Sequence, residues 1–303
     1  MKSAEVVVRT PGAHPLIRSA WIAAVCLFGV AAGVAAFLHA LRPAGVVAVV
    51  AIVLLIGGYA AYLVRHLAFE REIARAEAAL DAAELERARA ILAPLLERYP
   101  QLALVQRAAG RTLYALGDPL SSASLLEKAA RSYQDDAVVA ATLVASYAAL
   151  NRGGDARRAA ALAPRNVDVR LALAWSELVA LGGDRGAGDA MVRELRDRAD
   201  VRGVVTRGAM TAVLNAIAAA HVADAATADA ALAAVAAARE ALPAYEGAFI
   251  GYLEGVALRD LGRADAAVAA FDRAMSAAPG TIGEALARRE RANLMARLSA
   301  PRT

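Results

Sequence analysis

The chain has 303 residues, of which 59% are hydrophobic and only 5% aromatic, and it carries a formal net charge of +4. Most of this excess lies in residues 1–64, and elsewhere basic and acidic side chains are interspersed, a pattern that disfavours a nucleic-acid partner. Cys26 is the single cysteine, which excludes a disulfide within the chain and a cysteine-based zinc site.

Two long uncharged stretches, 20–41 and 44–64, are the first predicted elements. Each has about the ~20 residues that a helix needs to cross a bilayer, and only Arg42-Pro43 separates them. A cleavable signal peptide is the alternative for the first stretch, but a second full-length span follows it at once. The sequence therefore predicts a tail at 1–19 and two transmembrane helices over 20–64, with a turn at 42–43.

The orientation of this hairpin is predicted from the basic residues at its ends. The N-terminal tail has three of them and the segment after the second span has Arg65, Arg71 and Arg75, whereas the turn has only Arg42. Because basic flanks stay in the cytoplasm, we expect both termini there. The protein would then be an integral, multi-pass protein of the inner membrane, with the rest of the chain on the cytoplasmic side.

Small residues recur in both predicted spans. Gly29 and Gly33 form a GxxxG pattern in the first span, and Gly57 and Gly58 lie in the second. Small side chains let helices approach closely in lipid. Either the two spans pack on each other, or the pattern supports a homo-oligomer. Because no Gly or Pro occurs from 60 to 93, the second span either continues into the next helix or kinks at the membrane surface.

The last third of the chain has small and large residues in a fixed order: Gly255, Leu261, Gly262, Ala267, Phe271, Ala274 and Pro279. This order resembles the tetratricopeptide repeat (TPR), a pair of antiparallel helices about 34 residues long. The resemblance implies an all-α fold, in which the transmembrane hairpin precedes a TPR-type α-solenoid. It implies about six helix pairs over 65–280.

The quality of the resemblance varies along this region. It is strong at 248–279, good at 103–134 and 212–243, and degenerate at 137–164 and 167–200. About 11 residues more than two repeats occur between Pro164 and Pro243, near 181–188 and 197–208. We interpret the glycine-rich segment 181–188 as a loop between helices, since it lacks the Gly-Lys-Ser/Thr ending of a phosphate loop.

Two sequence signals mark helix starts. Asp118-Pro119 combines a capping side chain with proline at the first helical position. Thr281 and Glu284 have the spacing of a capping box, which opens a last helix extending to about Leu298. We therefore predict that 281–303 holds a capping helix and a short tail.

Motifs of catalysis and cofactor binding are not found in the sequence. The four histidines are scattered, and we interpret none as having a carboxylate at ligand spacing: His14, His39, His66 and His221. No Walker loop, GxSxG or dinucleotide fingerprint is present. We expect a non-catalytic protein with no cofactor and no metal.

The resemblance implies that the first helix of each pair lines a concave groove for protein partners. The groove positions would be Arg107, Arg111, Tyr114, Trp175, Tyr252 and Arg259. Small residues would separate them: Ala141, Ala145, Ala148, Ala216 and Ala220. Core packing is the alternative for Trp175 and Tyr252. We expect the arginines to be exposed, so that reversing their charge would leave folding nearly intact.

The leading functional interpretation is a membrane-anchored scaffold that binds proteins and assembles a complex. One alternative is a constitutive subunit of a membrane complex. The other is an accessory factor of a biosynthetic pathway, because haem-biosynthesis-associated membrane proteins also place two spans before tetratricopeptide repeats.

Overall fold

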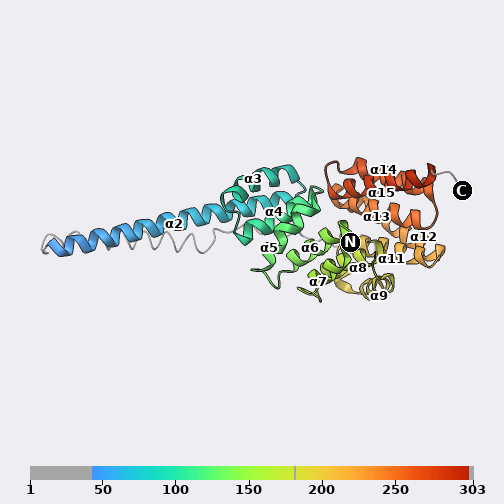
Figure 1. The fold of residues 1–303 in the computed structure, drawn as a ribbon, viewed down its shortest axis with the longest axis horizontal. Coiled ribbons are helices and arrows are strands. Elements are labelled where there is room, and N and C mark those ends of the chain that lie inside the picture. The colour runs from blue at the N-terminus through green and yellow to red at the C-terminus, as the bar shows by residue number, and fades with distance from the viewer. Residues whose placement is uncertain (1–42, 181, 300–303) are drawn as a thin grey trace, which may run out of the picture. The chain divides into compact units, whose positions relative to one another are not determined.

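The computed structural model describes residues 43–180 and 182–299, and these residues form helices and turns with no strand (Figure 1). The all-α prediction is therefore confirmed for this part of the chain. The first predicted span, with Gly29 and Gly33, lies outside the described residues. The chain divides into two compact units, Met1–Glu70 and Arg71–Thr303, which are taken separately below.

The described part of the first unit is the apolar start of helix α2, Pro43–Asp81. Proline suits the first helical position, because the N–H that it lacks would have no partner there. Within the described residues, one helix segment, Val53–Asp81, is long and apolar enough to cross a membrane, and no residue of its apolar window is buried. No described residue lies within 4 Å of a Cβ built on Gly57 or Gly58. Helix α2 is assigned without a break from Pro43 to Asp81.

The second unit consists of helices joined in pairs by short turns. The end of α2 precedes α3 (Leu85–Arg98), and the other pairs are α4 (Ala103–Ala115) with α5 (Pro119–Ala130), α6 (Ala137–Ala149) with α7 (Gly153–Ala160), α8 (Val167–Val179) with α9 (Arg185–Arg196), α11 (Val205–His221) with α12 (Ala225–Ala238), and α13 (Ala244–Asp260) with α14 (Ala264–Ala277). The last helix is α15 (Ile282–Ser299), and two short elements are α10 (Ala199–Arg202) and the 3-10 turn η1 (Arg239–Ala241).

The first helix of each pair also packs against the first helix of the next pair. This holds from α4 through α6, α8, α11 and α13 to α15, which together form an inner layer. The second helix of each pair packs on its own partner and belongs to an outer layer. The helices within a pair are antiparallel because turns of a few residues leave no room for another arrangement.

A residue with positive φ stands in the turn of each pair: Ala83, Gly117, Asn151, Gly182, Ala223 and Gly262. The first three are 34 residues apart, so the repeat length is present in the backbone as well as in the sequence. Such a left-handed residue ends a helix and turns the chain back. Glycine adopts this conformation without a steric penalty, as the sequence predicts for Gly262.

Close contacts inside two pairs repeat at the same spacing. A Cβ built on Gly255 would clash with Cε1 of Phe271, and one on Gly110 would lie 2.6 Å from Cγ of Leu126. In both pairs the large side chain comes 16 residues after the glycine. Phe271 and Leu126 are fully buried. Glycine is therefore required where the large side chain of one helix crosses the backbone of the other.

The predicted helix starts occur, with one change of partner. Asp118 Oδ1 accepts a hydrogen bond from Ser121 N at 3.0 Å and caps α5. Thr281 Oγ1 accepts a hydrogen bond from Glu284 N at 3.5 Å, and α15 begins at Ile282, the residue after Thr281. The Glu284 carboxylate accepts from the N–H of Gly280 and not from that of Thr281.

The interpretation of 181–188 as a loop is wrong for its second half. Helix α9 begins at Arg185, so Gly186 and Gly188 are helical. A Cβ on Gly188 would lie 2.8 Å from Cγ of Leu178, which gives this glycine a packing role. Part of the remaining extra length forms α10, and part lengthens α11 to 17 residues.

Candidate functional site

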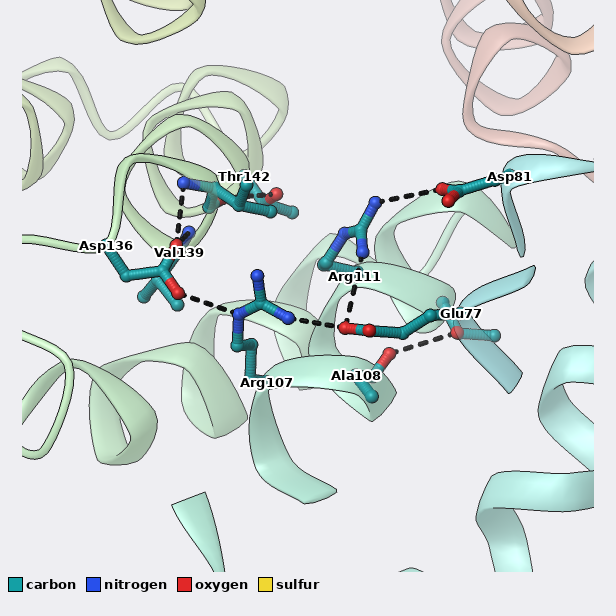
Figure 2. A network of polar contacts seen from close by, with 10 residues as sticks. Glu77, Asp81, Arg107, Ala108, Arg111, Asp136, Val139 and Thr142 are labelled. Atoms are coloured by element: carbon teal, nitrogen blue, oxygen red, sulfur yellow. Dashed lines mark hydrogen bonds and ion pairs between the residues drawn. The ribbon is translucent and has the colours of Figure 1, made fainter. Parts of the chain in front are cut away.

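Arg107 and Arg111 lie on α4 and connect it to the helices on either side. Arg107 Nε donates to Asp136 Oδ2 at 2.8 Å, and its Nη1 donates to Glu77 of α2 (Figure 2). Arg111 lies 3.4 Å from Asp81 and 3.6 Å from Glu77. The two arginine side chains are only 17% and 22% exposed. These residues therefore form a network that joins α2, α4 and α6.

Asp136 serves this network and the start of α6 together. Its Oδ1 accepts from the backbone N–H groups of Val138 and Val139 at 2.8 and 3.1 Å. Burial raises the pKa of the Asp136 carboxyl, but the hydrogen bond from Val139 and the charge of Arg107 outweigh that effect. The pKa of Asp136 is therefore below its ordinary value, which keeps the carboxylate charged beside Arg107.

The expectation of exposed groove arginines is wrong. Each guanidinium of the network already binds a carboxylate of the chain, and both are largely covered. Removing one partner of such a pair leaves the other charge poorly solvated. Reversing both charges would therefore disturb folding as well as any partner, contrary to the sequence-based expectation.

The three aromatic candidates come together inside the second unit. Trp175 of α8 and Tyr252 of α13 are 2% and 1% exposed, and Phe249 lies between them with its ring centroid 4.9 Å from that of Trp175. Tyr114 of α4 packs against the same cluster. Burial is the main cause that raises the pKa of Tyr252 to about 12, and burial also raises that of Tyr114. The core-packing alternative thus describes Trp175 and Tyr252, and Tyr114 joins them.

Arg259, the remaining candidate, lies at the end of α13. It donates to Asp260 at 2.8 Å and to Glu290 of α15 at 2.6 Å. Asp260 is also 3.2 Å from Nε2 of His221, the last residue of α11. This carboxylate partner was missed in the sequence, as was Glu70, which lies 3.3 Å from His66 one helical turn away. His221 with Asp260 and His66 with Glu70 are thus two pairs of potential metal ligands. No group of three or more such ligands occurs in the described residues.

The C-terminal helices contact the C-terminal ends of α4 and α6. Arg289 of α15 donates to the carbonyl of Ala149 at 2.9 Å. A Cβ on Gly117, just after α4, would lie 3.3 Å from the Thr281 carbonyl oxygen. Together with the contact between Tyr114 and the α13 aromatic residues, these contacts show that the inner layer curves until its last helices meet its early ones.

The small residues predicted for the groove divide into two groups. Ala148, Ala216 and Ala220 are buried, but Ala141 and Ala145 line a groove of about 240 Å³ that remains open. Its other lining residues are apolar or paired: Tyr114, Leu171, Ala172, Met210 and Phe249, with Thr142, Thr206 and the pair Asp168 and Arg207. Arg207 binds both carboxylate oxygens of Asp168 at 2.7 Å. Of the predicted binding face, a short apolar groove with a polar rim therefore remains open.

The acidic partners of the arginines were not anticipated from the sequence. Glu77, Arg107 and Asp136 follow one another at intervals of 30 and 29 residues, on α2, on α4 and directly before α6. An alternation of acid and base at nearly the repeat length is the signal that could have identified them.

The sequence matches no protein-family model, and no curated protein matches it. The function must therefore be inferred from the geometry.

Proposed function

We propose that this protein is a non-catalytic, membrane-anchored scaffold of the TPR type, which binds other proteins and assembles them at the inner membrane. Two features support the α-solenoid part of the proposal. The turns of the first three pairs are 34 residues apart, and the same glycine-to-large-residue contact occurs in two pairs. Both are what the family resemblance implies.

The proposed anchor is the apolar start of α2 together with the first predicted span. Large apolar side chains of α2 are exposed along this stretch, with Leu54, Leu55 and Val64 at 70%, 73% and 67%. Exposed apolar surface of this extent is unfavourable in water and is favourable in a bilayer.

The observation that carries the binding proposal is the groove beside Ala141 and Ala145. Its volume of about 240 Å³ suits one or two apolar side chains of a partner segment, and the Asp168–Arg207 pair can accept and donate hydrogen bonds at its rim. Helix-lined apolar grooves recognise partner segments through a few such anchoring side chains.

Affinity purification of the full chain from detergent-solubilised membranes tests this proposal. Ala141→Arg places a charge in the groove, and Ala234→Arg makes the same change on the exposed face of α12. We expect the first variant to lose co-purifying proteins that the second retains, with equal expression and equal melting temperature. Retention of the same proteins by both variants would exclude this groove as the binding site.

A further inference from the structure

A second cavity lies on the outer side of the array, between α9 and α12. Its volume is about 500 Å³, within the range of roughly 300–1,000 Å³ that is typical of small-ligand pockets. The last two turns of α11 contribute Ala218, Ala219 and His221 to its wall, and α9 contributes one polar face. The cavity is separate from the groove beside Ala141, with which it shares no lining residue.

Arginines dominate the charge of this cavity. Arg185, Arg193 and Arg196 line it, and their spacing of eight and three residues places them on one face of α9. Arg193 pairs with Asp189 at 2.8 Å, and Arg196 lies 3.8 Å from Asp197 outside the lining. Positive side chains therefore outnumber the carboxylates that line the cavity.

Asp189 and Asp224 are the carboxylates that line the cavity, and Asp224 already has a role in the fold. Asp224 caps α12 by accepting from Thr227 N at 3.1 Å, and both residues line the cavity. The first turn of α12, the positive end of its dipole, therefore lies at the wall. An anion in the cavity would be attracted by this helix end as well as by the arginines.

His221 adds a buried group with unused hydrogen-bonding capacity. Its side chain is 11% exposed, and Nε2 lies 3.2 Å from Asp260. Burial raises the pKa of Asp260, but hydrogen bonds from His221 and Arg259 lower it below the ordinary value, so this carboxylate is charged and accepts a hydrogen bond from Nε2–H. Within residues 43–180 and 182–299, the buried Nδ1 has no hydrogen-bond partner. Buried polar atoms without partners are uncommon and often mark a place where a ligand or water completes the bonding.

We propose that the α9–α12 cavity binds a small anionic molecule that carries a phosphate or carboxylate group. Arg185 and Arg193 bind the anionic group, Nδ1 of His221 accepts a hydrogen bond from a ligand hydroxyl or a bridging water, and the apolar wall of α11 contacts the rest of the ligand. Arginine suits both anions because its planar group binds two oxygens at once. The site is independent of the groove proposed for protein partners.

Isothermal titration calorimetry of the full chain in a non-ionic detergent tests the proposal, with pyrophosphate and citrate as probes. We expect saturable binding of at least one probe by the wild type. The double variant Arg185→Gln/Arg193→Gln should weaken that binding at least about tenfold, because charge-assisted hydrogen bonds are lost. Both arginines are exposed, so this variant should keep its helical content and melting temperature.

Arg165→Gln is the matched control, since Arg165 is exposed and does not line the cavity. It should bind as the wild type does. Competition by phosphatidylglycerol vesicles would support the proposal with a lipid head group as the source of the anion, and competition by soluble anions alone would support it with a soluble ligand. No saturable binding of either probe, or equal affinity in the double variant and the wild type, would overturn the proposal.

Discussion

At the scale of single residues, Arg107 shows why a groove position in this fold need not face a partner. Its guanidinium lies between Asp136 and Glu77, and these two carboxylates of the chain accept hydrogen bonds from its Nε and Nη1 (Figure 2). The same holds for Arg259, which is held by Asp260 and Glu290. These arginines connect neighbouring helices of the inner layer.

Replacing Arg107 should therefore destabilise the fold. Arg107→Gln leaves Asp136 without its cation and Glu77 with only the longer contact to Arg111, and it should lower the free energy of unfolding by about 1.5–3 kcal/mol, the usual range for hydrogen bonds to charged groups. Urea unfolding of the solubilised chain, followed by tryptophan fluorescence, measures the change. Arg165→Gln is the control and should stay within about 0.5 kcal/mol of the wild type. Equal unfolding midpoints for both variants would show that the network does not stabilise the protein.

The lowered pKa of Asp136 gives this network a pH dependence. Because the folded pKa lies below the unfolded value of about 3.9, the stabilisation is present above that pH and is lost as pH falls through the folded pKa. Asp136→Asn should reduce stability at pH 7, and its difference from the wild type should shrink near pH 3. Asp135→Asn, at the exposed neighbouring position, is the control. Asn keeps an Oδ1 that can cap α6, so a difference that does not change with pH would show that the charge of Asp136 is not its cause.

At the scale of helix pairs, the contact between Gly255 and Phe271 fixes how closely α13 and α14 approach. Gly255→Ala places a methyl group where the ring lies and should cost about 1–3 kcal/mol by overpacking. Gly208→Ala is the matched control, because its Cβ would meet no atom closer than 4.0 Å and alanine favours the helix.

A second substitution tests whether the ring causes this cost. Phe271→Leu should be less destabilising in the Gly255→Ala background than in the wild type, since the smaller side chain relieves the clash. Additive effects of the two changes on urea unfolding would contradict the contact.

Local signals predicted the pairs better than the pattern of contacts between them. Asp118-Pro119, Gly262 and the start of the last helix after Thr281 are set by neighbouring residues, and the sequence identified all three. The contacts of Tyr114 with α13 and of Arg289 with Ala149 depend on small rotations that add up over several pairs. No local sequence pattern encodes this accumulated rotation. The part of the concave face that the C-terminal helices contact could therefore not be predicted.

At the scale of the whole molecule, the proposed function combines an anchor in the membrane with a repeat domain beside it. The basic residues on both flanks of the predicted hairpin predict a cytoplasmic location for that domain. A reporter fused after Thr303 should therefore be active as a cytoplasmic fusion, and strong alkaline phosphatase activity of a C-terminal fusion would place the domain on the opposite side.

The most direct test of the scaffold proposal is photocrosslinking in intact membranes. A photoreactive amino acid at Ala141 lies in the open groove, and the same group at Ala234 lies on the exposed face of α12. The proposal predicts a discrete adduct with another protein from position 141 that is absent from position 234. No adduct at position 141, or the same adducts from both positions, would contradict the proposal that this groove holds a protein partner.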